Sequence, residues 1–331
     1  MNHYSDNVPI FSLLKARENN NIRLGLCCIN NTLRNPPKVK RGEKKIEPIY
    51  CSRTCIRSTY TVDKVKELAL QNVKDIIPIL EWNHQNGIYH YRMSSEMFPH
   101  ITDLECESYT IDFAVSELKK AGDKAKELNH RITMHPAQWN QIGAKSESVF
   151  ESTVRDLSYH ASILDAMELS DESILCIHGG GTYGDKEGTM RRWIEQFGDL
   201  PQSVKKRIAI ENCEKCYSVE DVLHLSKECK IPVIYDTHHY HCYNHFHPEE
   251  KQKPIVELIP EILESWGDKR PVFHISEQKP DKPVGTHSDM IENIPGHLLE
   301  IPDLYSVPID IEVEAKDKER AIFYLKNKYK I

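Results

Sequence analysis

The chain of 331 residues carries 43 Lys and Arg, 50 Asp and Glu and 17 His, and its formal net charge of −7 argues against a nucleic-acid partner. With 39% apolar residues, the composition excludes a disordered tail or a collagen-like fibre and fits one long α/β domain or two smaller ones. No apolar run approaches the ~18 residues of a membrane span, and the first residues lack the order of a secretory signal, so we expect an intracellular protein of the cytoplasm or nucleus that binds no membrane.

Short apolar runs alternate with helical patterns after a weakly ordered lead-in, which we expect over residues 1–21. The runs are rich in Ile, Val, Cys and Tyr, as strands buried on both faces should be. They lie at 23–29, 88–93, 130–135, 173–178, 207–211, 232–236, 271–275 and 308–313. Helical spacing predicts helices at 61–84, 109–128, 147–168, 218–229, 253–266 and 316–328, a weaker one at 186–198, and only a short helix after the seventh strand.

This alternation predicts that residues 22–331 form a single (β/α)8 TIM barrel. The alternative is a doubly wound open sheet. A dinucleotide-binding sheet of that kind usually carries a G-x-G-x-x-G turn after its first strand, and the chain has none there.

A His or an acidic residue stands at or near the C-terminal end of six successive predicted strands. Singly, such residues are most often hydrogen-bonded structural groups. The series comprises His135, His178, Glu211, Asp236, His239, His274 and Glu314, with His287 and Asp289 in the loop after the seventh strand. These strand ends converge at one mouth of a barrel, and imidazoles with carboxylates are ligands for Zn²⁺, Mn²⁺ or Fe²⁺. We therefore expect a cluster of two or three ions at the C-terminal face of the strands, suited to displacement at phosphorus, with Glu211 as the bridging carboxylate.

The strand ends lie within a series of short motifs. These are RLGLCCINNTL (23–33), YRMSSEMFP (91–99), HPAQW (135–139), CIHGGG (176–181), IENCE (210–214), IPVIYDTHHY (231–240), FHIS (273–276), THSDMI (286–291) and IEVEAKDKE (311–319). With these motifs in this order, the sequence resembles the ultraviolet-damage endonucleases, repair enzymes that nick DNA 5′ to pyrimidine photoproducts. That family is similar in fold to endonuclease IV, a trinuclear-metal (β/α)8 barrel.

The resemblance implies a metal-dependent DNA endonuclease that acts on damaged double-stranded DNA, and we expect a monomer. It implies Mn²⁺ as the first choice of ion, with Zn²⁺, Co²⁺ or Mg²⁺ as the others. The metal ligands that it implies are the set that the strand ends propose, namely His135, His178, Glu211, Asp236, His239, His274, His287 and Glu314. Gln138 and Trp139 match the pair that probes the damaged duplex, and Asn30 matches a residue that contacts the DNA backbone.

Three positions depart from the family pattern. Leu26 stands where members carry a probing Tyr, Asp103 stands where they often carry a His, and Val272 stands where many carry a Lys. These departures bear on one ligand position and on the photoproduct specificity more than on the metal-dependent cleavage itself.

A basic segment follows the first predicted strand. Residues 1–60 contain 11 Lys and Arg against 4 Asp and Glu, whereas residues 61–331 contain 32 and 46. In a barrel, the segment 34–57 emerges on the catalytic face, so we expect Lys38, Lys40, Arg41, Lys44 and Lys45 to contact phosphates. The total charge then loses its value against a nucleic-acid partner, because bound cations would neutralise acids of the metal site.

Two other functions and one further feature stay open. A sugar isomerase barrel also uses His, Glu and Asp at its strand ends, and a damaged-DNA sensor would bind without cutting.

The residues after Asp236 are dense in His, with His238, His241, His245 and His247. We expect a polar surface loop there, and additional metal binding is the alternative.

Overall fold

The computed structural model describes residues 21–40, 42 and 44–331, and the expected lead-in over 1–21 lies almost wholly outside them. Eight parallel strands close into a barrel in the order of the chain. They are β1 Ile22–Cys27, β2 His90–Met93, β3 Arg131–Met134, β4 Leu175–His178, β5 Ile208–Glu211, β6 Val233–Asp236, β7 Val272–Ile275 and β8 Ile309–Val313. Each strand end lies within two residues of its prediction, so the TIM barrel is confirmed and the open sheet is wrong.

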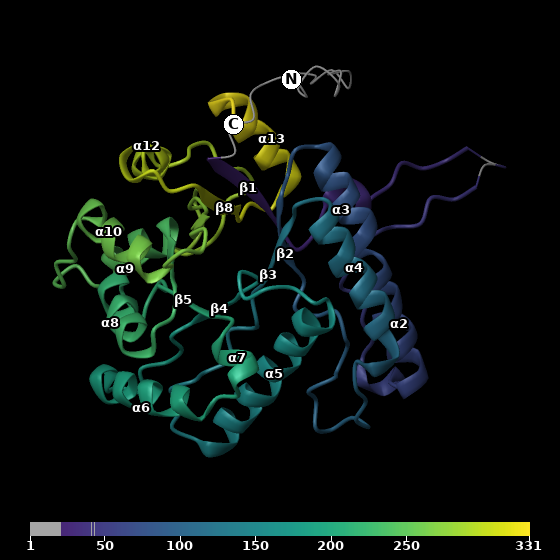
Figure 1. Ribbon diagram of the computed structural model, residues 1–331, viewed down its shortest axis with the longest axis horizontal. Coiled ribbons are helices and arrows are strands. Elements are labelled where there is room, and N and C mark those ends of the chain that lie inside the picture. Colours follow the sequence, from purple (N-terminus) through teal and green to yellow (C-terminus); the bar gives the residue numbers. More distant parts are fainter. Residues whose placement is uncertain (1–20, 41, 43) are drawn as a thin grey trace.

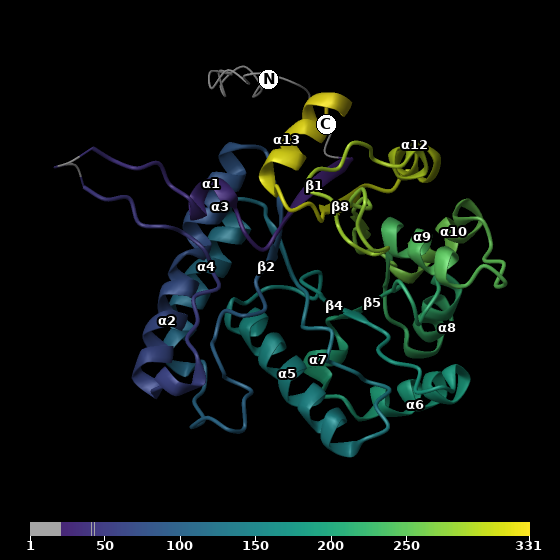
Figure 2. The same ribbon diagram turned by 180° about the vertical axis from the view of Figure 1, so that it is seen from behind.

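The helices follow one another around the outside of the barrel in chain order (Figures 1 and 2). They are α1 Asn31–Arg34, α2 Val62–Lys74, α3 Ile76–Gln85, α4 Val115–Glu127, α5 Glu147–Ala166, α6 Lys186–Asp199, α7 Gln202–Lys205, α8 Val219–Cys229, α9 Thr237–Phe246, α10 Ile255–Ser265, α11 Gly296–Leu299, α12 Ile301–Tyr305 and α13 Glu319–Tyr329. Within the described residues, no helix combines the length and the apolar character needed to cross a membrane.

Two predictions need correction, one of a helix and one of a loop. The helix expected over 61–84 is two helices, α2 and α3, which meet at Asp75. The break has a local cause, because Pro78 has no N–H to donate to the carbonyl of Lys74. The loop expected after Asp236 is the helix α9, which begins there because Asp236 Oδ1 accepts the backbone N–H groups of His238 and His239, at 2.7 and 2.8 Å.

The strand side chains alternate between the helical layer and the barrel interior. Outward residues such as Tyr91, Ile210 and Phe273 join the main apolar core. On one side of the interior, a small separate cluster is apolar and contains Ile174, Cys176, Ala209, Ile234, Trp266 and Val272. The expectation of strands apolar on both faces therefore holds for β4 to β7 except at the residues that reach the mouth, which are His178, Glu211, Asp236 and His274.

The other side of the interior, from β1 to β3 and β8, is charged. The carboxylate of Asp310 is fully buried and pairs with Arg270 Nε at 2.7 Å, Arg131 Nη1 at 3.1 Å and His90 Nδ1 at 3.2 Å. A Cβ on Gly25 would lie 2.8 Å from the His90 ring, so this glycine leaves the space that the ring occupies. These buried ion pairs support the group of polar side chains at the C-terminal mouth of the barrel.

Candidate metal centre

One buried carboxylate, that of Glu211 at the end of β5, is surrounded by four imidazoles. His274 Nδ1 lies 2.9 Å and His239 Nδ1 3.3 Å from its Oε1. His135 Nε2 lies 3.0 Å and His178 Nε2 3.6 Å from its Oε2. Because each oxygen of Glu211 faces two imidazoles, this carboxylate is well placed to bridge two ions.

Asp236 supplies a second carboxylate at the end of β6. Its Oδ1 caps α9, whereas its buried Oδ2 has no hydrogen-bond partner among the described residues. The buried Nδ1 of His178 likewise finds none within that part of the chain. Unpartnered buried polar atoms cost free energy. Asp236, Glu211 and His239 each bring a possible ligand atom within 4.8 Å of the others, so the unpartnered Asp236 oxygen fits the donor set of an ion.

Glu314, just beyond β8, is the third carboxylate. Its oxygens lie 3.3 Å from His274 Nδ1 and 3.6 Å from His287 Nδ1, and it forms an ion pair with Arg92 of β2. His287 is the most exposed ligand candidate, which places it at the rim. The structure therefore brings all eight predicted ligands into one contact network at the C-terminal mouth, where Asp236 Oδ1 lies 4.0 Å from His239.

The pKa shifts of these groups follow from burial and from neighbouring charges, and they differ from residue to residue. Burial raises the pKa of Glu211, but His274 and His178 outweigh this and hold it well below its usual range. Burial raises the pKa of Asp236, whereas Arg92 and His274 overcome burial and lower the pKa of Glu314 to about 2. Burial lowers the pKa of His178 to about 4, which favours the neutral imidazole that binds metals.

Buried residues below the mouth orient these groups. Glu312 Oε2 lies 3.1 Å from His274 Nε2, and Glu312 Oε1 accepts a hydrogen bond from Thr133 at 2.6 Å and lies 2.7 Å from His90 Nε2. Arg92 Nη1 lies 3.2 Å from Glu312. The residue pattern along the chain did not reveal this layer, although Glu312 lies in β8 two positions before Glu314, which continues the strand direction, and therefore faces the same side.

Two more residues at the centre were missed. Glu214 lies 3.5 Å from His239 Nε2, and the Cys176 thiol donates to Glu211 Oε2 at 3.1 Å. Glu214 had a visible signal, because it stands in IENCE three residues after Glu211. Asp289, in contrast, pairs with Lys279 at 2.8 Å and does not join the network.

The residues expected to contact DNA lie in different settings. Gln138 and Trp139 are exposed just after His135, and 47% of the Trp139 surface is accessible. Asn30 is buried, its Oδ1 caps α1 at Leu33 N, and its Nδ2 has no partner among the described residues. Lys38, Lys40, Lys44 and Lys45 lie on a long segment that extends away from the barrel after α1 (Figure 1), and Arg41 lies outside the described residues.

The three departures from the family pattern have clear surroundings. Leu26 is a core residue, and Val272 belongs to the apolar interior cluster. Asp103 pairs with Arg57 at 2.8 Å and with His100 at 3.2 Å, and none of its contacts within the described part of the chain is to the eight ligand candidates. These positions therefore offer the centre neither a ligand nor a cation.

Comparison with known proteins gives a family match over nearly the whole chain. The model of the family described as UV-endonuclease UvdE matches residues 22–330. The chain is 36% identical to the UV-damage endonuclease of Schizosaccharomyces pombe over 93% of this chain and 51% of that protein. It is 33% identical to the UV DNA damage endonuclease of Bacillus cereus over 80% of this chain and 82% of that protein. The chain thus spans about half of the yeast relative.

Solved structures agree with this match. The crystal structure of SacUVDE superimposes with a TM-score of 0.78 at 29% identity, covering 93% of this chain and 98% of that one. Endonuclease IV from Thermus thermophilus gives a TM-score of 0.53 at 13% identity, covering 78% of this chain and 94% of that one. The similarity to endonuclease IV concerns the fold alone, and it confirms the expectation that the two proteins share a fold.

Proposed function

Because the chain belongs to the UV-endonuclease UvdE family, we propose that it is a DNA repair endonuclease. It recognises UV photoproducts in double-stranded DNA and hydrolyses the phosphodiester bond 5′ to the lesion. The observation that carries this proposal is the buried carboxylate of Glu211 among four imidazoles at the mouth of the barrel.

The eight side chains around Glu211 would hold two or three divalent ions, Mn²⁺ before Zn²⁺, Co²⁺ or Mg²⁺. Such ions supply an activated water and positive charge at the leaving oxygen. In this assignment Asp236 would offer Oδ2, which has no partner among the described residues, and Glu211 would serve as the bridging carboxylate. Arg92 and Glu312 hold Glu314 and His274 in the orientation that ligation needs.

Trp139 and Gln138 would sense the lesion. Photoproducts stack poorly, so a duplex that contains one is easier to bend and open than an intact duplex. An exposed indole beside the metal centre can enter the weakened base step and stack on the bases. The protein would then select damaged DNA by how easily the duplex deforms, without recognising the base sequence.

Replacing Trp139 by Ala should reduce the preference for damaged over undamaged duplex by about 1–3 kcal/mol, the usual contribution of one base–aromatic stack. Competition binding with irradiated and unirradiated duplexes measures this preference. Tyr305→Ala is a suitable control, because that exposed ring lies on α12, shortly before β8 and hence on the side of the barrel away from the mouth. An unchanged preference in the Trp139 variant would remove it from lesion recognition.

Neutralising Lys38, Lys40, Arg41, Lys44 and Lys45 with Gln should weaken binding to all duplexes alike. Each phosphate contact that is lost should reduce the slope of log K against log salt by about 0.9. Binding titrations at several salt concentrations measure the slope. In the control, Lys119, Lys120, Lys124 and Lys126 on the outer helix α4 are changed to Gln. Equal slopes in both variants would mean that the segment does not contact DNA.

The decisive test offers irradiated, unirradiated and abasic duplexes to metal-loaded protein and to protein treated with a chelator. We expect nicking of the irradiated duplex only, on its 5′ side, and only with metal. Preference for the abasic duplex would identify an abasic endonuclease instead. Nicking that survives chelation would contradict the metal centre.

The alternatives fit the chain less well. A sugar isomerase does not belong to this family, and a sensor without catalysis would not need three carboxylates at one mouth. All ten cysteines are free, which accords with a protein of a reducing compartment such as the cytoplasm or nucleus. We further propose that the protein acts as a monomer.

A further inference from the structure

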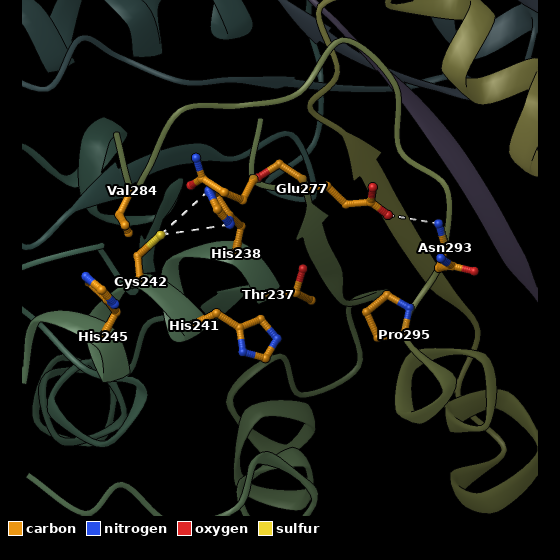
Figure 3. A pocket seen from close by; sticks show the side chains of 11 residues that line it. Thr237, His238, His241, Cys242, His245, Glu277, Val284, Asn293 and Pro295 are labelled. Carbon is orange, nitrogen blue, oxygen red and sulfur yellow. Dashed lines mark hydrogen bonds between the residues drawn. The ribbon is translucent and has the colours of Figure 1, made fainter. Parts of the chain in front are cut away.

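The helix α9 presents four metal-binding side chains outside the centre described above. His238, His241, Cys242 and His245 stand at positions i, i+3, i+4 and i+7, which share one helix face. All four line a cavity of about 430 Å³ between α9 and the chain that follows β7 (Figure 3). In the loop expected from the sequence they would be unrelated, whereas the helix gathers them at one wall.

Two of the four lie close to ligand separation. Cys242 Sγ lies 3.6 Å from His238 Nε2 and 3.8 Å from His238 Nδ1. Because the sulfur is almost equidistant from both nitrogens, a turn of the His238 ring is needed to point one of them at a shared ion. A tetrahedral zinc ion with bonds of about 2.3 Å to sulfur and about 2.0 Å to nitrogen requires a separation of about 3.5 Å. His238–Cys242 and His241–His245 are both i, i+4 pairs, the spacing at which two side chains of one helix bind one zinc ion.

The cavity also contains polar groups that have no adequate partner. His238 is 5% exposed, and within the described part of the chain its ring has only the weakly bonding thiol of Cys242 as a hydrogen-bond partner. Ser276, at 7% exposure, lines the same cavity, and its Oγ has no partner among the described residues. An ion with bound water would satisfy these groups, whose burial is otherwise costly.

We propose that this cavity is a separate site for one zinc-like transition-metal ion. Cys242 and His238 bind it directly, and His241 or His245 completes the set after a rotation of its exposed side chain. Water bound by Ser276 occupies the remaining space. Binding releases the thiol proton, so that Cys–SH and M²⁺ give Cys–S⁻–M²⁺ and H⁺.

The site lies beside the centre without sharing its ligands. The rings of His238 and His287 are 5.7 Å apart, and His238 directly precedes His239. An ion on α9 would therefore fix the first turn of the helix that positions His239. The proposal does not depend on the endonuclease assignment, since it concerns residues that the assignment leaves unused.

Cobalt titration of the full-length protein, first stripped of metal, tests the site. Only a sulfur ligand gives a thiolate-to-cobalt charge-transfer band, so ions bound by imidazoles and carboxylates alone are silent. Cys176 lies beside Glu211, and a Cys176→Ser variant, which should keep the band, separates the α9 site from that thiol. The wild type should show the band, and Zn²⁺ should displace it. Cys242→Ser should lose the band and one equivalent of bound cobalt, whereas Cys216→Ser, a change at a half-buried thiol elsewhere, should keep both.

Because Cys242 is buried, a melting curve must show that its variant folds. The exposed pair provides an independent test. The double variant His241→Ala and His245→Ala should lower the cobalt affinity by more than about tenfold, because even residues that only orient metal ligands usually contribute at least that much. A wild type without the band, an unchanged band in Cys242→Ser, or unchanged affinity in the double variant would overturn the site. Nicking of irradiated DNA, measured on the same samples, reports separately on the proposed function.

Discussion

A Glu211→Gln protein is expected to nick irradiated DNA at least about a thousandfold more slowly than the wild type, a loss of about 4 kcal/mol in transition-state stabilisation. Both oxygens of Glu211 face imidazoles, and Gln replaces one of them by an NH₂ group that cannot bind a metal. The bridge between ions would be lost while the surface that meets DNA stays the same. Single-turnover nicking, metal content and binding to irradiated duplex measure the three effects.

The matched control is Glu261→Gln on the outer helix α10, whose carboxylate pairs with Lys227 at 2.6 Å. It should retain full activity and full metal content. We expect the Glu211 variant to bind irradiated DNA nearly as well as the wild type. If the metal-loaded Glu211 variant still cleaves at the rate of the control, Glu211 is not the bridging ligand.

Replacing Asp310 by Asn should lower the free energy of unfolding by about 3–5 kcal/mol, as is usual when one partner of a buried ion pair is removed. Asp310 is 0% exposed, and its loss removes the carboxylate that pairs with Arg131 and Arg270, whereas His90 keeps Glu312. Burial raises the pKa of Asp310, but His90, Arg131 and Arg270 overcome it and hold the pKa below its usual range. The ion pairs therefore stabilise the wild type above about pH 4, the pKa of an unfolded Asp, and this contribution is lost as the pH falls further.

Urea unfolding at neutral pH measures the difference, and repeating it at low pH should bring the two proteins closer together. Asp123→Asn on α4 is the matched control, because Asp123 pairs with Lys119 and Lys126 at the solvent-exposed surface. It should leave stability unchanged. A similarly small effect at Asp310 would mean that water or neighbouring residues compensate the buried cations.

Much of the candidate centre could be predicted because its ligand candidates are spaced by the barrel itself. Each strand is short, so the residue at its end is also the residue at the mouth, and the order of His135, His178, Glu211 and Asp236 along the chain is their order around the site. Glu312 and Arg92 were missed because they lie within strands and not at strand ends. Charged residues are rarely buried, so the interior of a strand does not suggest a site residue.

The helix α9 shows the opposite case. Its sequence THHYHCYNHF has no apolar period, so the pattern indicated a loop. The helix begins at Asp236 because that side chain caps two backbone N–H groups, while its other oxygen has no hydrogen-bond partner among the described residues. A cap of this kind cannot be recognised until the strand end and the next turn are seen together.

The amino-acid sequence by itself therefore determined the barrel, the eight ligand candidates that meet at its mouth and the family, because strand period, strand ends and motif order are all local along the chain. Only the tertiary structure decided that half of the barrel interior is charged, since Asp310 and Glu312 meet His90, Arg92 and Arg131 across strands that lie far apart in sequence. It also decided that the His-rich stretch is a helix with a cavity along it, because the cap at Asp236 and the chain after β7 come together only in the folded protein.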